Sequence, residues 1–152
     1  MADANAMWPV PTYHFKVNID GEDIGSFQEV SGLKRTVDTM DYRGGDSPEF
    51  FVQKIPGLQK FENITLKRGV FQDQKQFSDW MKEVQDNLST HDLGEARKQV
   101  IIELLDASQT PIMTWTIERA FPVSVTYPTL NSTSNEVAIE TLEFVHEGIT
   151  IT

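Results

Sequence analysis

Cysteine is absent from this sequence of 152 residues, and histidine is scarce. Without cysteine the chain can form neither disulfide bonds nor thiolate metal sites, and its composition is compatible with a reducing cytoplasm. The three histidines, His14, His91 and His146, lie far apart and show no H-E-x-x-H spacing. We therefore expect no metal site and no cofactor.

The motifs of common catalytic centres are also missing. Gly44-Gly45 is not followed by the G-K-[ST] of a phosphate-binding loop, and the sequence contains no G-x-S-x-G elbow. Glu136, Glu140 and Glu143 are candidates for paired acid and base carboxylates. On a strand they would not share one face, because positions 140 and 143 differ by an odd number. We expect no catalytic residue and no enzyme activity.

Positively charged residues are few: the chain has 13 Lys and Arg and 23 Asp and Glu, which gives a net charge of -10. This balance argues against nonspecific binding to a phosphate backbone. No stretch approaches the ~20 apolar residues of a membrane span, and residues 1–7 lack the basic and apolar regions of a signal peptide. We expect no membrane insertion by this chain, and one globular domain over residues 1–152.

Residues 115–147 hold two long strand-like runs joined by one polar loop, and we expect the rest of the chain to pack against them. In residues 115–127 the apolar side chains stand mostly at odd positions and short polar ones between them, which predicts a strand with one wet face. Residues 136–147 are partly apolar at both odd and even positions. Such a strand is expected between layers or against a neighbouring subunit.

Other strands and one helix complete the predicted fold. Alternating patterns predict strands at residues 13–19, 24–30, 33–42, 64–69, 97–106 and 148–152, with residues 24–30 as the hairpin partner of the first. Asp73 is the expected N-cap of a helix whose packing face carries Phe77, Trp80, Met81, Val84 and Leu88. The expected fold is mainly β (α+β), a small β-barrel or sandwich of about eight strands with one flanking α-helix.

The connection over residues 43–59 is unusual because it combines glycine and proline with much apolar bulk, including Phe50-Phe51-Val52 and Ile55-Pro56-Gly57-Leu58. A solvated loop rarely carries so many large apolar side chains. We therefore expect this loop to dock on another surface. The alternative is that Phe50 and Phe51 cover the core of their own chain.

Short motifs along nearly the full length carry a family resemblance. They are Pro9-Val10-Pro11-Thr12-Tyr13 with Phe15, Phe27-Gln28-Glu29-Val30-Ser31-Gly32-Leu33, Ile55-Pro56-Gly57-Leu58, Ile64-Thr65-Leu66-Lys67-Arg68-Gly69-Val70, Trp115 with Ala120-Phe121-Pro122, and Ser134-Asn135-Glu136-Val137-Ala138-Ile139-Glu140. In this order they resemble the inner tube proteins of contractile injection systems, a family that includes the tail tube proteins of contractile-tailed phages.

The resemblance implies a structural subunit that forms stacked hexameric rings, a hollow conduit inside a contractile sheath. Its implied partners are further copies of itself, the sheath protein, baseplate and terminal cap proteins, and a translocated cargo of protein or DNA. The implied location is the bacterial cytoplasm during assembly and then an injection particle. The opening Trp8-Pro9-Val10-Pro11-Thr12-Tyr13 is closer to phage-like injectors than to phage tails that carry DNA. A monomeric β-barrel that binds a small ligand is the alternative from another class.

Two sets of candidate site residues follow. In such families the long loop contacts neighbouring subunits and rings, so the predicted interface residues are Trp8, Tyr42, Arg43, Phe50, Phe51, Val52, Ile55, Pro56 and Leu58. Short polar residues that recur on single strand faces are candidates for the lumen wall, or else for an outer face covered by sheath. These are Thr36, Asp38, Thr65, Lys67, Thr114, Thr116, Glu118, Ser124 and Thr126.

Overall fold

A computed structural model describes residues 9, 11–25, 27–91 and 93–152, so the expectation for Trp8 lies outside the described residues. The described residues form ten strands, one α-helix and two short 3-10 helices. In chain order these are β1 Phe15–Ile19, β2 Glu22–Asp23, β3 Glu29–Ser31, β4 Arg35–Tyr42, β5 Gln53–Phe61, β6 Ile64–Gly69, α1 Gln76–Asp86, η2 Leu88–Thr90, η3 Gly94–Ala96, β7 Lys98–Leu105, β8 Pro111–Thr126, β9 Ile139–Val145 and β10 Gly148–Ile151.

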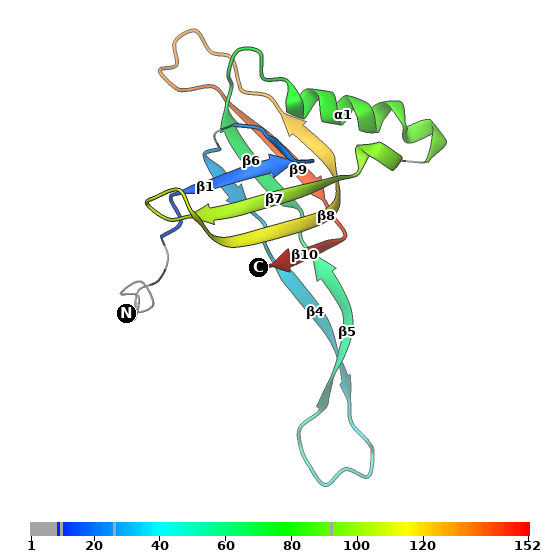
Figure 1. Cartoon of the computed structure of the whole chain (residues 1–152). Coiled ribbons are helices and arrows are strands. Elements are labelled where there is room, and N and C mark those ends of the chain that lie inside the picture. The colour runs from blue at the N-terminus through cyan, green and yellow to red at the C-terminus, as the bar shows by residue number, and fades with distance from the viewer. Residues whose placement is uncertain (1–8, 10, 26, 92) are drawn as a thin grey trace.

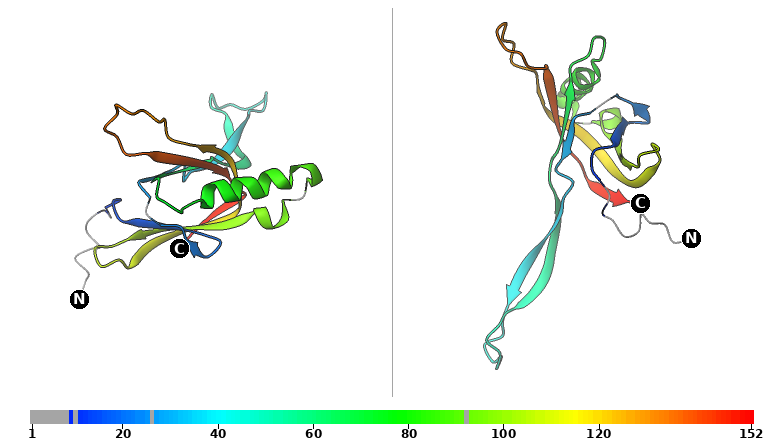
Figure 2. Two further views of the ribbon diagram at one scale, coloured as in Figure 1. Left: turned by 90° about the horizontal axis from the view of Figure 1, so that it is seen from above. Right: turned by 90° about the vertical axis from the view of Figure 1, so that its left-hand side faces the viewer.

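Eight strands form one antiparallel sheet in the order β2-β1-β7-β8-β9-β6-β3, with β10 paired to β8, while β4 and β5 form a separate two-stranded ribbon. The sheet bends into two layers that face each other (Figures 1 and 2). The first layer contains β1, β2, β7, β10 and the start of β8, and the second contains the end of β8 with β9, β6 and β3. The mainly β fold with one flanking helix is confirmed, and the described sheet stays open between β2 and β3.

The core lies between the two layers and under α1. Phe77, Trp80 and Val84 of the helix are buried, and Trp80 packs beside Phe144 of β9. Most of the rest of the core comes from both layers: Val17, Ile19, Val100, Ile102, Ile117 and Ile149 from the first, and Ile64, Leu66, Leu142 and Phe144 from the second. No helix within the described ranges has the length and hydropathy needed to cross a membrane.

The ends of the helix differ from the prediction. Its N-cap is Lys75, because Asp73 has a positive φ of 67° and lies in the turn before the helix. Leu88 belongs to the following 3-10 helix and is exposed, so it does not extend the packing face. Met81 is only half-buried at the margin of that face.

The predicted odd-numbered apolar face over residues 115–127 is wrong between Ile117 and Ser124, but it holds again at Val125, which is partly buried against the core. The pairing register of β8 shifts opposite Lys98 and Val100, where Arg119 has a φ of 54°, and shifts again between Pro122 and Ser124. Each irregularity moves the next residues to the other side of the strand. Ala120 and Pro122 therefore point inward, and the odd-numbered residues Val123 and Tyr127 are exposed.

Three further expectations need correction. The hairpin partner of β1 is the short β2, and β3 pairs with β6 in the other layer, so residues 24–30 are not the hairpin partner of the first strand. In β9 the even-numbered side is fully buried and the odd-numbered side, with Ile139 and Val145, is half-buried, so the strand faces the core with one side only. Residues 53–59 belong to β5, so the connection predicted over residues 43–59 is a loop only as far as Val52.

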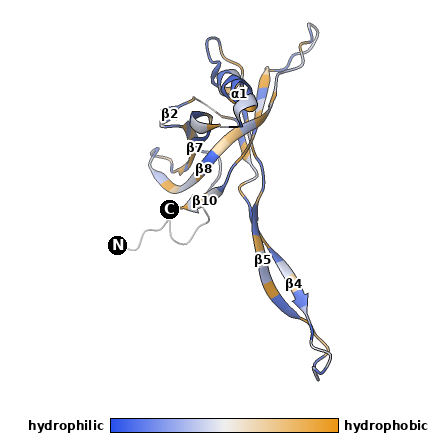
Figure 3. Ribbon diagram, turned by 90° about the vertical axis from the view of Figure 1, so that its right-hand side faces the viewer, coloured by the Kyte–Doolittle hydropathy of each residue, from blue (hydrophilic) through white to orange (hydrophobic). Residues whose placement is uncertain are grey.

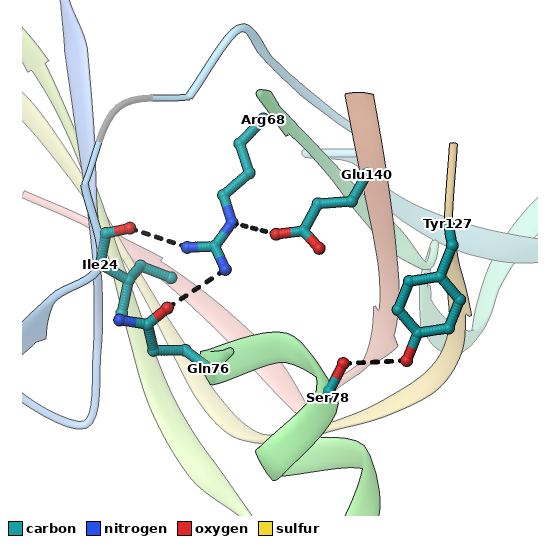
Figure 4. A network of polar contacts seen from close by, with 6 residues as sticks. All are labelled: Ile24, Arg68, Gln76, Ser78, Tyr127 and Glu140. Atoms are coloured by element: carbon teal, nitrogen blue, oxygen red, sulfur yellow. Dashed lines mark hydrogen bonds and ion pairs between the residues drawn. The ribbon is translucent and has the colours of Figure 1, made fainter. Parts of the chain in front are cut away.

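A buried ion pair joins the second layer to the helix (Figure 4). The guanidinium of Arg68 in β6 donates from Nε to Oε1 of Glu140 in β9 at 2.6 Å, from Nη1 to the carbonyl of Ile24 at 2.9 Å and from Nη2 to Gln76 Oε1 at 3.2 Å. It also lies 4.0 Å from the ring centroid of Phe77. Arg68 is 0% exposed, so its charge is neutralised inside the protein by these contacts. The role of Glu140 is thus to pair with Arg68 inside the core.

Candidate assembly interface

The β4–β5 ribbon projects away from the two-layered body (Figures 1 and 2). Its strands pair from Arg35 opposite Phe61 to Tyr42 opposite Gln53, with one register shift near Asp38. Cross-strand ion pairs follow its length: Lys34–Glu62 at 3.0 Å, Lys60–Asp38 at 2.6 Å and Lys54–Asp41 at 2.5 Å. Exposed pairs contribute little each, and a lone two-stranded ribbon is marginally stable in water. Contact with another surface would therefore stabilise the ribbon.

The ribbon carries a concentration of exposed apolar side chains. Parts of β5 are coloured as hydrophobic in Figure 3. They are Val37, Met40, Tyr42, Phe50, Phe51, Val52, Ile55 and Leu58. Phe50 is 99% exposed and Phe51 is 65% exposed, so neither residue covers the core of its own chain. The ribbon's apolar side chains stand in solvent instead of lining a pocket, as a monomeric ligand-binding module would require.

The end of the ribbon is ordered by Arg43. Its guanidinium donates to the carbonyl of Glu49 at 3.1 and 3.0 Å and to that of Ser47 at 3.4 Å. These bonds close the loop that presents Phe50 and Phe51. Arg43 thus acts within its own chain, on the main chain beside the predicted contact residues.

On the strands of the ribbon, Met40 is directly opposite Ile55, and Tyr42 shares their side because side chains alternate along a strand. Thr36 and Asp38 lie on that same side of β4, nearer the body. Pro56 pairs with Thr39 next to the register shift. The predicted interface and lumen residues of β4 therefore share one face of a twisting ribbon.

The second layer presents a polar outer face. Pairing places its residues in two rows across β3, β6, β9 and β8: Ser31, Thr65, Glu143 and Ser124 in one, and Glu29, Lys67, Thr141 and Thr126 in the other. Lys67 Nζ lies 3.6 Å from Glu29 Oε2, and Asn63 Nδ2 donates to Glu143 Oε1 at 2.7 Å. The structure thus brings four lumen candidates together, namely Thr65, Lys67, Ser124 and Thr126.

Three other lumen candidates, Thr114, Thr116 and Glu118, lie in the first layer. Thr116 pairs with Ile101 and Thr150, on the side of β8 opposite buried Ile117. The inward side chains of both layers meet in one core, so the outer faces of the layers point away from each other. Thr114, Thr116 and Glu118 are therefore not on the polar face of the second layer.

We found no group of three or more His, Asp and Glu suited to a metal ion in the described part of the chain. Glu140 and Glu143 lie on opposite faces of β9, as their spacing predicts, and each is engaged by a neighbouring side chain. The exposed features of the subunit are thus an apolar ribbon and a polar sheet face.

A family model described as T4-like virus tail tube protein gp19 matches residues 11–150. The chain belongs to this family of tail tube proteins. It is 29% identical to a chain in the PVC sheath-tube complex of an extracellular contractile injection system, covering 100% of this chain and 99% of that chain with a TM-score of 0.83. It is 30% identical to a chain in the tube-terminating cap of the anti-feeding prophage, covering 100% and 99% with a TM-score of 0.80.

The tail tube fold extends to more distant proteins. Hcp1 from Flavobacterium johnsoniae is 14% identical, with 90% of this chain and 93% of that chain covered and a TM-score of 0.55, which shows a common fold. No curated protein sequence matched the chain. The chain is a structural tube subunit of the contractile injection system type.

Proposed function

We propose that this tail tube subunit closes into rings of six, and that the rings stack into the hollow tube of an extracellular injection particle. The exposed apolar ribbon is the observation that carries this proposal. A protruding, heterologous contact joins each copy to the next and so builds rings or filaments. Burying Phe50 and Phe51 against a neighbour would stabilise the contact by roughly 1.5 to 3 kcal/mol each.

Its partners in the particle are a contractile sheath, a baseplate and a terminal cap. Similar solved chains come from a sheath-tube complex, a tube terminator and a baseplate, which supports this assignment. The chain acts over residues 1–152 as one domain, by assembly without catalysis. Assembly takes place in the bacterial cytoplasm before the particle reaches the outside.

The polar face of the second layer is the wall of the lumen in this proposal. Its threonines and serines offer small hydroxyl groups, and its Lys67 is paired with Glu29. Cargo that passes such a surface meets few apolar side chains to which it could adhere. The ribbon is continuous with this layer, because β4 follows β3 and β5 precedes β6. Thr36 and Asp38 then extend the same wall, and Thr114, Thr116 and Glu118 lie on the outside.

A phage tail tube that carries DNA is the second candidate, because the matching family is described from a virus. Overall similarity to injector tubes, at 29% to 31% identity over nearly the whole chain, favours an injector with protein cargo. Identifying the contents of purified particles by mass spectrometry and nuclease treatment separates these two functions.

The test of assembly is the Phe50→Ser/Phe51→Ser double variant. We expect wild-type protein to form rings or filaments in negative-stain micrographs, and the variant to elute as a folded monomer from size-exclusion chromatography. Phe71→Ser/Leu88→Ser is the matched control, since both residues are exposed and outside the ribbon. Tubes formed by the Phe50/Phe51 variant would overturn the proposal, as would equal loss of assembly in the control.

A further inference from the structure

The ribbon joins the body through two short links that are packed closely together, which we call the ribbon root (residues 32–34 and 61–63). Gly32 has a φ of +90°, and a Cβ at this position would lie 2.1 Å from the carbonyl oxygen of Asn63. Lys34 pairs with Glu62 across the root at 3.0 Å, and Asn63 donates to Glu143 of β9 at 2.7 Å. The root therefore fixes the direction in which the ribbon leaves the body.

His146, at the turn between β9 and β10, packs on this root. Its Nε2 lies 3.1 Å from the carbonyl oxygen of Glu62, and its ring centroid lies 5.2 Å from that of Phe61. A carbonyl oxygen can only accept a hydrogen bond, so Nε2 carries the proton of the neutral ring. Nδ1 is then a bare acceptor, buried with no hydrogen-bond partner among the described residues.

The charged groups around His146 are engaged elsewhere. The Glu62 carboxylate pairs with Lys34, and the Glu143 carboxylate accepts from Asn63. Glu147, the next residue, is held by Arg97 at 3.1 Å and by Arg119 at 2.6 Å, the latter from the irregular part of β8. Burial lowers the pKa of His146, and the main-chain groups of Glu62 and Gly148, which favour the protonated ring, offset part of that effect. Protonation of this ring places a positive charge in a half-buried site. The carboxylates of Glu62, Glu143 and Glu147 are not free to neutralise that charge.

We propose that His146 is a pH-sensitive latch on the ribbon root. The neutral ring holds Glu62 and Phe61 in the arrangement that directs the ribbon toward the next subunit. A proton on Nδ1 converts a buried acceptor into a donor and adds a positive charge, so the turn and the root rearrange and the subunit contact weakens. The inference rests on the proposed role of the ribbon in assembly.

The test measures tube formation by light scattering and negative-stain microscopy at about pH 7.5 and about pH 5.5, a window in which histidine titrates and most carboxylates stay ionised. We expect wild-type assembly to fall several-fold at the lower pH. His146→Gln, which keeps a donor for the Glu62 carbonyl but does not titrate, should assemble equally at both values. His91→Gln, at an exposed position, should respond like wild type.

Two outcomes overturn the latch: wild-type assembly that is unchanged across this window, or a His146→Gln variant that keeps the full pH response. Either result leaves the proposed function intact if Phe50→Ser/Phe51→Ser still abolishes assembly. A second measurement uses that monomeric double variant. In its NMR spectra, the main-chain amides of residues 61–63 should shift with the same midpoint as the His146 ring, and amides that stay fixed would also overturn the latch.

Discussion

The body and the ribbon of this subunit use apolar residues in opposite ways. In the body, Leu66, Leu142 and Phe144 are 0% exposed and hold two sheet layers together. In the ribbon, Leu58 and Phe50 are 75% and 99% exposed and hold nothing within the chain. Burial, and not hydrophobicity, decides what a side chain contributes to folding. Body variants should therefore change stability, and ribbon variants should change assembly.

The largest effect should come from the buried ion pair of the body. Arg68→Met leaves the carboxylate of Glu140 buried without its partner, so we expect a loss of about 3 to 5 kcal/mol in the free energy of unfolding, measured by urea denaturation. Arg68→Met/Glu140→Leu should recover much of this loss because no unpaired charge remains. A single variant as stable as wild type would show that water or another group solvates Glu140.

A matched pair of leucines tests the comparison directly. Leu142→Ala should lower the free energy of unfolding by about 2 to 5 kcal/mol, because it leaves a cavity between the layers. Leu58→Ala should change it by less than about 0.5 kcal/mol, since that side chain is in solvent. Thermal unfolding of both monomers measures the difference. Equal losses would mean that the ribbon folds back on the body in solution.

A single methyl group added at the ribbon root should lower both stability and assembly. Gly32→Ala places Cβ against the Asn63 carbonyl at a positive φ, and we expect a cost of about 1 to 3 kcal/mol together with weaker assembly. Gly45→Ala is the control near the ribbon end, because a Cβ there meets no atom within 4 Å. If both variants unfold at the same denaturant concentration, the root is not the tightly packed joint described above.

The smallest effect on folding should be the pH dependence from His146. Its pKa in the folded chain lies below the ordinary value of about 6.5, so the unfolded chain binds the proton more readily. The contribution of His146 to the free energy of unfolding is therefore fully present above about pH 6.5, and it is lost as the pH drops through the pKa of the folded state. Urea midpoints of wild type and His146→Gln, compared between about pH 7.5 and 5.5, should diverge at the acid end. Parallel curves would show that burial of this ring is not maintained in solution.

Sequence patterns predicted the parts of the fold that depend on local spacing. The packing face of α1 and the alternation of Ile64 and Leu66 in β6 are periodic, and the structure confirms Phe77, Trp80 and Val84 of the helix and both residues of the strand as buried. The pattern of β8 misled because the irregularities near Arg119 and Val123 change which side faces inward. Bulges depend on pairing with distant strands, so local alternation does not reveal them.

The candidate site was predictable in composition but not in arrangement. The sequence named most of the exposed apolar residues of the ribbon but not Val37 and Met40. Pro56-Gly57 concealed β5 because proline rarely occurs inside a sheet. An exposed two-stranded ribbon tolerates Pro56 beside its register shift. The lumen candidates lie in two different layers. The sequence did not indicate this, because the bend of the sheet depends on tertiary contacts and not on local spacing. The Arg68–Glu140 pair joins residues 72 positions apart, and no local signal marks it.

A density map of the assembled tube is the most direct test of the central claim that the ribbon is the contact between subunits. We expect Phe50 and Phe51 to be buried against a neighbouring copy, while the Thr65 and Lys67 side of the second layer faces the channel. A map in which both phenylalanines remain in solvent, with the subunits joined through other surfaces, would contradict it.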